Sequence, residues 1–397
     1  MCEREEKTEM ANMANVLGLI FANMHEQSVA DLTKKRTLAS VPFGGRYRMI
    51  DFPLSNMVNS DIDNVGIITK DNYLSLMDHL GSGDEWDLSR KTGGMHLLPP
   101  YGNSNALYRG RLEAMAQVKP FIESSNAEYV LLSDADVVAN IDYRPIIDFH
   151  EKNGADITVV YGRGTFTTEQ TMTKTVLAVN SDNVIYDVLI RPEISGEHNV
   201  SLNMFVVSKD FLLNEIRDAE SRNLYSFEID VLQKKLHEIK VLGYKFDKPF
   251  AQIDSMDTYF KTNMKLVDKS LRAHLFMSDA PIYTKVRDDA PAKYGIDADV
   301  KNSLVADGCV IEGTVENCVL FRGVKIEKGA KVKNCILMQD TTVGAKAEMN
   351  FVITDKNVTI SEYRSLAGTE TYPVFVNKGA TVSVSYTHLT LPTILRV

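Results

Sequence analysis

A six-residue periodicity in the C-terminal third of the chain most strongly limits the fold that this sequence can adopt. Apolar residues recur there in two phases, and small glycines punctuate the series. A six-residue period with two apolar phases is typical of a parallel β-helix, whereas an antiparallel sheet of short hairpins would show a period of two residues. We expect about five coils of about eighteen residues each. The two phases are Cys318, Val324, Ala330 and Ile336, and Leu320, Ile326, Val332 and Met338.

The first two thirds of the chain show a different pattern, in which short apolar runs alternate with helix-like segments. The runs that we interpret as buried strands are residues 16–22, 64–69, 129–132 and 156–161. Such an alternation predicts a mostly parallel α/β sheet with helices on both faces. Ligands of these sheets bind beyond the carboxyl ends of the strands. We place the boundary near residue 285, which predicts an α/β domain over 14–284 and a β-helix over 285–384.

Composition narrows the classes of function. The 397-residue chain has a formal net charge of −9, which gives no support to a role in binding nucleic acid or an anionic membrane. Its four cysteines form no CxxC pair, and nothing resembles a signal peptide or a membrane span. We therefore expect a reduced, cytoplasmic protein. We interpret residues 1–13 as an N-terminal extension and residues 385–397, which abandon the six-residue rhythm, as a non-native tail.

One segment, VPFGGRYRMIDFPLSN at residues 41–56, combines a glycine pair with nearby cations. Gly44 and Gly45 predict a tight turn, and Arg46 and Arg48 place two positive charges beside it. Cations and backbone amides at a turn can hold a phosphate. A purely structural turn whose arginines pair with carboxylates is the alternative, and the segment alone does not separate the two.

This segment resembles the sugar-nucleotide pyrophosphorylases, most closely the bacterial glucose-1-phosphate adenylyltransferases. Further matches are LYRG at 107–110, EYVLLSDADVVANIDY at 128–143 and IDSMDTYFKTNMKL at 253–266. The resemblance covers residues 14 to about 380. It implies a nucleotidyltransferase-like (Rossmann-like) domain followed by a C-terminal left-handed parallel β-helix. It also implies a reaction in which ATP and glucose 1-phosphate give ADP-glucose and diphosphate.

The same resemblance supplies candidate site residues. Asp136 and Asp254 fall on the two metal aspartates of the family, and carboxylate oxygens suit Mg²⁺, the one cofactor that the resemblance implies. Two isolated aspartates are not specific for a metal site, and the alternative is that they are turn residues at strand ends. The candidates for binding a sugar phosphate or a phosphate are Arg46, Arg48, Arg191, Ser201 and Asn203.

The phosphate-binding loop of the family is missing. After the first strand the family carries GGxGxRL, but this chain has Ala22, Asn23, Met24, His25 and Glu26. Bulky side chains prevent the backbone from approaching a triphosphate, and the Glu26 carboxylate is unfavourable beside phosphates. His25 is no substitute, because this chemistry needs positioned phosphates more than a base.

Basic residues have changed at three further positions. Leu38 stands where the family motif KRAKPAV has its second lysine, and Arg191 replaces the lysine of EKP. Arginine and lysine differ in their geometry at a phosphate. The family motif YRGTA is replaced by residues 108–112, which read YRGRL and carry Arg111. All of these changes affect contacts to phosphate or nucleotide.

The pattern therefore resembles the GlgD-type partner subunit of the enzyme rather than the catalytic subunit. The resemblance implies a weakly catalytic or non-catalytic chain in a heterotetramer with a catalytic subunit in bacterial glycogen biosynthesis. Three alternatives are weighed against it: a self-sufficient pyrophosphorylase, a β-helix acyltransferase, and a sensor that binds glucose 1-phosphate without turnover. A short β-helix favours oligomer contacts over a long acyl-donor groove.

Overall fold

The computed structural model describes residues 15–100 and 108–383. The predicted N-terminal extension and the predicted non-native tail lie outside the described residues. The described chain divides into two compact units. Unit 1 contains residues 15–24, 50–250 and 278–283, and unit 2 contains residues 25–49, 251–277 and 284–383. The boundary near residue 285 stays a prediction, because unit 2 also takes two segments from the earlier part of the chain.

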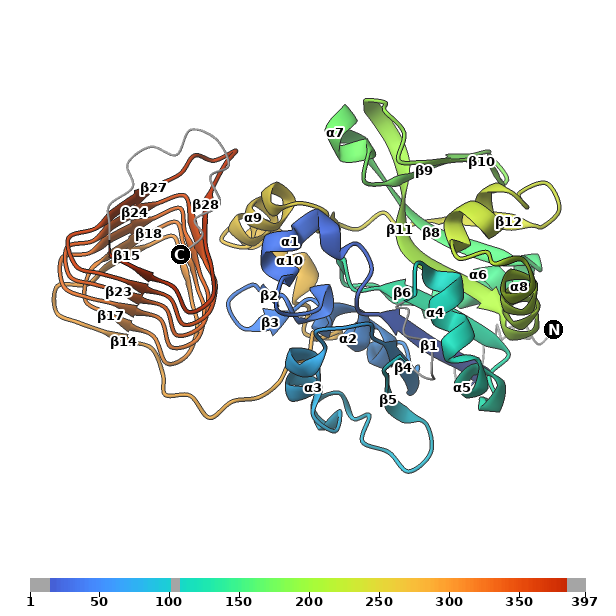
Figure 1. Cartoon of the computed structure of the whole chain (residues 1–397), viewed down its shortest axis with the longest axis horizontal. Helices are drawn as coiled ribbons and strands as arrows, with labels where there is room; N and C mark the ends of the chain where they lie inside the picture. The colour runs from blue at the N-terminus through green and yellow to red at the C-terminus, as the bar shows by residue number, and fades with distance from the viewer. Residues whose placement is uncertain (1–14, 101–107, 384–397) are drawn as a thin grey trace, which may run out of the picture. The chain divides into compact units, whose positions relative to one another are not determined.

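Unit 1 is built on a nine-stranded sheet (Figure 1). Its strands are β1 (Val16–Phe21), β4 (Asn64–Ile68), β5 (Gly94–Leu98), β6 (Tyr129–Asp134), β8 (Ile157–Phe166), β9 (Thr175–Val179), β10 (Ile185–Ile190), β11 (Gly196–Ser208) and β12 (Val241–Lys245). The order is β10-β9-β11-β6-β1-β4-β5, with β8 beside β11 and β12 beside β8. Strands β6, β1, β4 and β5 are mutually parallel, as the alternation of strands and helices predicted. Strand β11 runs antiparallel to β6, β8 and β9.

Helices surround this sheet. They are α2 (Asp51–Asn59), α3 (Leu74–Leu80), α4 (Arg111–Gln117), α5 (Lys119–Ser124), α6 (Arg144–Asn153), α7 (Thr168–Thr171) and α8 (Lys209–Arg222), with the short turns η4 (Asp84–Trp86) and η5 (Phe227–Gln233). Leu17 and Leu19 of β1 join the same buried cluster as residues of α4 and α8. Gly18, on the opposite face, is close to Met57 of α2. Strand β1 is therefore buried on both faces, which explains why its sequence is continuously apolar.

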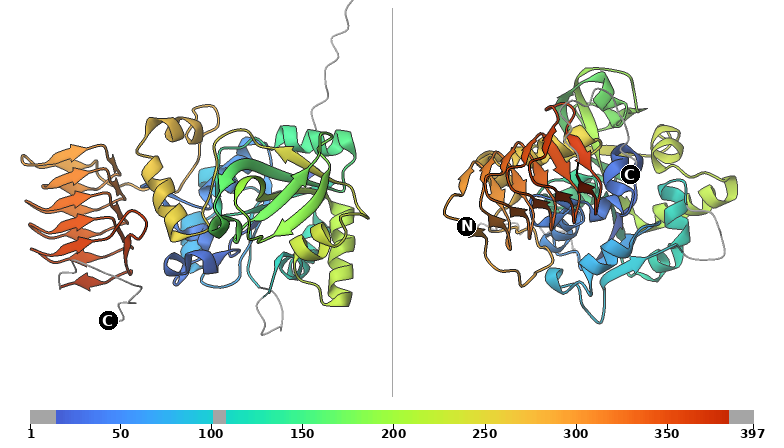
Figure 2. Two further views of the ribbon diagram at one scale, coloured as in Figure 1. Left: turned by 90° about the horizontal axis from the view of Figure 1, so that it is seen from above. Right: turned by 60° about the vertical axis from the view of Figure 1, so that its left-hand side comes forward.

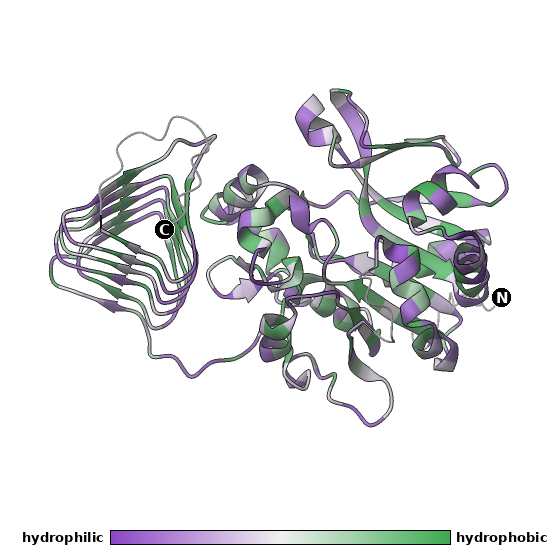
Figure 3. Cartoon of the chain, in the orientation of Figure 1, coloured by the Kyte–Doolittle hydropathy of each residue, from purple (hydrophilic) through white to green (hydrophobic). Residues whose placement is uncertain are grey.

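Hydropathy follows this layering, with hydrophobic strands and helices that carry polar residues on their outer sides (Figure 3). Helix α8 shows how local sequence sets the ends of a helix. The Ser208 hydroxyl accepts a hydrogen bond from the Phe211 amide at 3.3 Å, and Asn223 ends the helix in the left-handed conformation with φ of 56°. Serine is favoured at the N-cap because its hydroxyl accepts from a free backbone amide. Asparagine is favoured at the C-terminal end because it tolerates the left-handed conformation.

The C-terminal part of unit 2 is a parallel β-helix of stacked coils (Figure 2), consistent with the left-handed form that the family resemblance implied. One sheet has six strands and two sheets have five. The first sheet contains β14 (Lys293–Tyr294), β17 (Val310–Ile311), β20 (Lys325–Ile326), β23 (Thr342–Val343), β26 (Thr359–Ile360) and β29 (Thr381–Val382). The second contains β15 (Asp299–Lys301), β18 (Thr314–Glu316), β21 (Lys331–Lys333), β24 (Glu348–Asn350) and β27 (Ser365–Ala367). The third contains β16 (Leu304–Val305), β19 (Val319–Leu320), β22 (Ile336–Leu337), β25 (Val352–Thr354) and β28 (Val374–Val376).

The eight apolar residues that revealed the repeat are all buried. The coils, expected at about eighteen residues each, differ in length: Asp299 pairs with Thr314 after fifteen positions, and the interval is seventeen in the next coils. Thr314 pairs with Lys331, seventeen positions later, and Lys331 pairs with Glu348 after the same interval. The reason is an asparagine corner. Asn317 adopts φ of 53°, so that the chain passes from β18 to β19 in two residues. The corner between β19 and β20 takes four residues.

These corners stack into a ladder of asparagine side chains. Asn302 donates to Asn317 at 3.2 Å, Asn317 to Asn334 at 2.6 Å and Asn334 to Asn350 at 2.9 Å. Asparagine tolerates the left-handed conformation better than other side chains with a Cβ, and its amide can both donate and accept. The corners at Asn317 and Asn334 are thereby bonded to the coils on both sides of them.

The rest of unit 2 packs around a small turn. Its elements are η2 (Glu26–Val29), α1 (Ala30–Thr33), η3 (Leu38–Ser40), β2 (Pro42–Phe43), β3 (Tyr47–Arg48), β13 (Ala251–Gln252), α9 (Met256–Lys265) and α10 (Lys269–Leu275). Strands β2 and β3 pair antiparallel, and the Tyr259 hydroxyl of α9 donates to the Pro42 carbonyl at 2.6 Å. Tyr47 stacks on Phe276. Over residues 15–100 and 108–383, no helix is long and apolar enough to cross a membrane.

Candidate functional site

The carboxyl ends of β1 and β6 lie side by side, because Phe21 pairs in register with Asp134. The chain that follows β1 is held by its own contacts. The Ala22 amide donates to the Ile68 carbonyl at 3.0 Å, and the Asn23 side chain accepts from the Lys70 amide at 2.8 Å. One backbone and one side-chain hydrogen bond thus fix the start of the loop, where the sequence has no glycine.

The continuation of that loop, in unit 2, is also engaged locally. His25 has φ of 62° and precedes η2, and the Glu26 carboxylate accepts from the Leu38 amide at 3.3 Å. The Glu26 carbonyl accepts from the Thr33 hydroxyl at 2.9 Å. The Glu26 carboxylate and carbonyl are thus both engaged within the chain, and the loss of the phosphate cradle at residues 22–26 stays a prediction.

Asp136 and Asn203, two predicted site residues in unit 1, are brought together. Asp136 is buried and accepts from the Asn203 side-chain amide at 3.0 Å. Asn203 lies in an irregular stretch of β11, with φ of 56°, and its backbone amide donates to the Ser201 hydroxyl at 3.2 Å. The strand irregularity therefore directs the side-chain amide of Asn203 towards the Asp136 carboxylate. Arg191 lies instead at an exposed turn with φ of 52°, where its amide donates to the Lys174 carbonyl.

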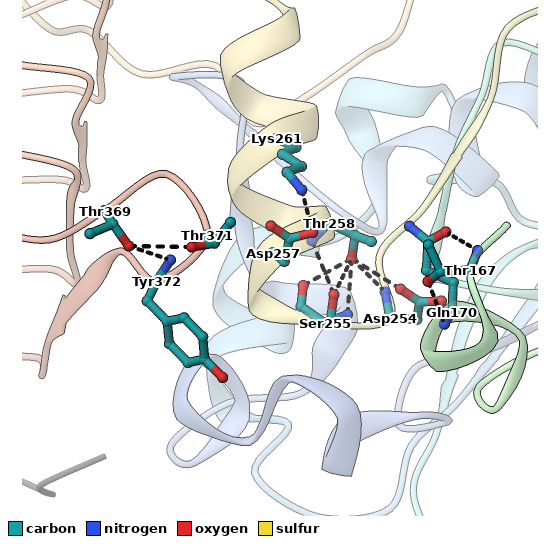
Figure 4. A network of polar contacts seen from close by, with 10 residues as sticks. All are labelled: Thr167, Gln170, Asp254, Ser255, Asp257, Thr258, Lys261, Thr369, Thr371 and Tyr372. Atoms are coloured by element: carbon teal, nitrogen blue, oxygen red, sulfur yellow. Dashed lines mark hydrogen bonds and ion pairs between the residues drawn. The ribbon is translucent and has the colours of Figure 1, made fainter. Parts of the chain in front are cut away.

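Asp254, the second predicted metal ligand, belongs to unit 2 and to the start of α9 (Figure 4). Its carboxylate accepts from the Thr258 hydroxyl at 3.1 Å, and that hydroxyl also accepts from the Ser255 amide at 2.9 Å. Ser255 in turn caps the helix by accepting from the Thr258 amide at 3.0 Å. A reciprocal capping box thus fixes the Asp254 side chain.

The chemistry of these two carboxylates fits Mg²⁺. Asn203 and Thr258 are neutral donors, and a neutral donor orients a carboxylate without neutralising it. Oxygen ligands of this kind suit a hard divalent cation. If the ion binds, it would supply charge neutralisation for phosphate oxygens, and the protein would orient the carboxylates through Asn203 and Thr258.

The glycine turn of unit 2 has the predicted geometry. Gly44 and Gly45 have φ of 60° and 87°, values that favour glycine, and the Gly44 amide donates to the Asn263 side chain at 2.9 Å. Arg46 beyond the turn is exposed and Arg48 is half-buried. The turn therefore places both cations at the surface of unit 2 or just below it.

A second basic group, which sequence reasoning did not single out, lies in the same unit. Arg36 is buried, and its Nη2 pairs with both carboxylate oxygens of Asp355, at 2.7 and 2.8 Å. Burial, together with repulsion from Arg48 and Arg36, lowers the pKa of the neighbouring Lys356 to about 7. One carboxylate thus compensates several cations, and a bound anion would stabilise such a group.

In unit 1 the sequence also failed to anticipate that Arg111 is buried against carboxylates. Its guanidinium pairs with Asp134, at the end of β6, and with Glu228 of η5. The available signal was that Asp134 lies inside a motif that matches the family, and that Arg111 directly follows the matching LYRG segment, where this chain departs from the family. Spacing along the chain could not show that the two motifs meet.

Comparison with known proteins agrees with this architecture. Residues 27–268 match the nucleotidyl transferase family model, and residues 289–370 match the GlmU-like C-terminal hexapeptide model. The chain is 36% identical over 365 residues to the glycogen biosynthesis protein GlgD of Bacillus subtilis (strain 168), covering 92% of this chain and 96% of that protein. A glycogen biosynthesis protein GlgD of Geobacillus stearothermophilus is 37% identical over 322 residues, with 80% and 82% covered.

A similar level of identity extends to named adenylyltransferases. The glucose-1-phosphate adenylyltransferase of Clostridium perfringens (strain 13 / Type A) is 33% identical over 342 residues, covering 84% of this chain and 86% of that protein. Matches of this extent include both the α/β part and the β-helix. The chain therefore belongs to the glucose-1-phosphate adenylyltransferase family of nucleotidyltransferases, within which it resembles the GlgD proteins over most of its length.

Proposed function

We propose that this chain acts in bacterial glycogen biosynthesis as a subunit of a glucose-1-phosphate adenylyltransferase. The enzyme joins ATP and glucose 1-phosphate to give ADP-glucose and diphosphate. In this proposal the chain has little or no catalysis of its own and modulates a catalytic homologue, with which it forms a heterotetramer in the cytoplasm. The similarity to both GlgD and adenylyltransferases supports the pathway.

The observation that carries the proposal is the loop after β1. The Ala22 backbone and the Asn23 side chain are held by the hydrogen bonds to Ile68 and Lys70, and no glycine occurs between Ala22 and Glu26. Transfer of a nucleotidyl group depends on donors positioned around the phosphates. Loss of one such donor typically lowers the rate by about 10²–10³-fold, and residues 22–26 lack the glycines that let backbone donors approach phosphates closely.

Modulation of a partner requires coupling between the subunits. This chain can change the activity of a catalytic homologue only if its contacts differ between two states of that homologue. Its own Asp136 and Asp254 could still hold Mg²⁺, which would be a remnant of the family chemistry and not a requirement for coupling.

The test measures ADP-glucose formation from ATP, glucose 1-phosphate and Mg²⁺. We expect this chain alone to be at least about 10³-fold slower than its host's catalytic homologue. Mixing the two should change the maximal rate, the substrate affinity or the effector response. The matched control is Asp136→Asn in this chain, which should leave the behaviour of the mixture unchanged. Robust turnover by this chain alone, abolished by Asp136→Asn, would instead identify a self-sufficient enzyme.

A further inference from the structure

The Arg111 side chain lies at the edge of the unit 1 sheet where open α/β sheets bind ligands. Its guanidinium carbon lies 5.8 Å from the ring centroid of Phe21, the last residue of β1, and 5.6 Å from that of Phe205 in β11. It also pairs with Asp134, the last residue of β6. The guanidinium therefore lies at the carboxyl ends of two adjacent parallel strands, which is where open α/β sheets bind their ligands.

The donors of this guanidinium are directed at two carboxylates. Arg111 Nε donates to one Asp134 oxygen at 3.1 Å, Nη2 pairs with the other Asp134 oxygen, and Nη1 pairs with Glu228. Arg111 and Asp134 are 3% and 1% exposed. A planar guanidinium engaged on two sides is held in one orientation. It could contact a phosphate only by breaking a buried ion pair.

The charge of the group also matters. One cation faces two carboxylates, so Arg111, Asp134 and Glu228 together carry a net negative charge. A triphosphate brought to this edge would meet both an occupied volume and like charge, which is strongly unfavourable where water is excluded. The fold does not demand such a group, because buried ion pairs can often be replaced by apolar residues without loss of stability.

We infer that Arg111, Asp134 and Glu228 form an internal plug that occupies the nucleotide edge of the sheet and keeps ATP out. The inference deepens the proposed function and rests on it for the identity of the excluded ligand. It adds a second cause of lost catalysis, independent of the loop after β1. It also implies that any effect of ATP on a mixed enzyme arises on the partner subunit.

The test opens the plug without changing the net charge of the chain. In the double variant Arg111→Thr with Asp134→Ser, one positive and one negative charge are removed. Glu228 keeps its hydrogen bond from the Ser226 hydroxyl at 3.2 Å. The probe is a fluorescent ATP analogue with Mg²⁺, titrated against this chain alone. We expect no saturation of the unaltered chain up to about 1 mM, and binding at least about tenfold tighter in the double variant.

A neighbouring pair supplies the matched control. Arg109 pairs with Glu113 at the surface, where the arginine side chain is 46% exposed. The variant Arg109→Thr with Glu113→Ser likewise removes one positive and one negative charge, two positions before and two after Arg111, and should leave probe binding as weak as before. A gain in both double variants would show a general loosening of α4 and would overturn the plug.

Two other results overturn the inference. One is saturable binding of the probe by the unaltered chain with a dissociation constant below about 0.1 mM. The other is a cooperatively folded double variant that binds no more tightly than the unaltered chain. If the double variant does not fold, Arg111→Lys replaces it, since lysine keeps the charge but cannot bridge both carboxylates. Unchanged binding in that variant also counts against the plug.

These outcomes are separate from those of the proposed function. The titration uses this chain alone, whereas the proposed function is tested by mixing two subunits. A plug that fails the titration leaves a changed rate in the mixture intact. Equally, a mixture without any change in rate leaves the titration to be interpreted by itself.

Discussion

Two buried arginines, one in each unit, show how the same side chain can serve opposite electrostatic environments. Arg111 of unit 1 faces two carboxylates, Asp134 and Glu228. Arg36 of unit 2 faces the single carboxylate of Asp355. It also repels the nearby Lys356, as Arg48 does. The first environment has an excess of negative charge and the second has an excess of positive charge.

The difference indicates which part of the molecule keeps the ability to bind an anion. In unit 1 the buried Arg111 is neutralised by the protein itself. In unit 2 the pKa of Lys356 falls to about 7 because burial and nearby arginines disfavour its charged form. A protein that pays for such repulsion regains stability when an anion binds. We therefore expect anions to stabilise unit 2 and to leave the Arg111 group unaffected.

Removal of the Asp355 carboxylate should have the largest effect. In Asp355→Ala, Arg36 remains buried beside other cations but loses the carboxylate with which its Nη2 pairs. Lys356 loses the negative charge that favours its own charged form. Breaking one side of a buried pair costs roughly 3–5 kcal/mol. We expect a loss of that size in the free energy of unfolding, measured by urea denaturation at pH 7.

Asp134→Ala is the comparison variant. Arg111 keeps Glu228 as a partner there, so the loss should be smaller, about 1–3 kcal/mol. Phosphate should stabilise Asp355→Ala more than it stabilises the unaltered chain, and Asp134→Ala by no more than the unaltered chain. Equal losses in the two variants, or equal rescue by phosphate, would remove the distinction between the two arginines.

The fold could be predicted from the sequence to a large extent, because its two signals are periodic. The phases through Leu320 and Cys318 predicted a buried β-helix, and the apolar run after Val16 predicted a strand buried on both faces. The differences in coil length were not predicted, because the six-residue rhythm does not reveal that Asn317 turns a corner in two residues. Strand β11 was missed because its first half is polar and its middle is irregular.

The site was less accessible to sequence reasoning. Motif matches identified Asp136 and Asp254, but they did not reveal that Asn203 orients one and Thr258 the other. The pairs Arg111–Asp134 and Arg36–Asp355 join residues 23 and 319 positions apart in the chain. Pairing over such distances depends on the tertiary fold, and a single sequence contains no signal for it.

Substitution of Lys356 should give an intermediate effect of opposite sign. Its pKa in the folded chain is about 7 and its ordinary value is 10.5. Between these values the unfolded chain binds a proton that the folded chain does not, so Lys356 makes stability rise with pH over this window. The cost of charging it is fully present below about pH 7 and absent near pH 10.5.

We therefore expect Lys356→Met to raise the free energy of unfolding by roughly 1–3 kcal/mol at pH 6.5, with a gain that shrinks towards pH 10. Urea denaturation of both proteins across that range measures it. Lys346→Met serves as the control, since that lysine also lies in the β-helix and has no such burial. A gain that does not depend on pH would show that packing of the methionine, and not charge, is the cause.

Binding of inorganic phosphate should give the smallest effect. Arg48 and Arg36 both disfavour the charged form of Lys356, and a bound anion would offset that repulsion, so we expect weak binding of phosphate there. With a dissociation constant on the order of 3 mM, about 10 mM phosphate stabilises the folded state by roughly 1 kcal/mol. That gain corresponds to a rise of about 2–4 °C in Tm, relative to chloride at equal ionic strength. The rise should be at least halved in Lys356→Met and unchanged in the Arg111→Thr, Asp134→Ser variant. If phosphate stabilises all three proteins equally, the anion acts through the solvent and the excess of positive charge in unit 2 does not form a site.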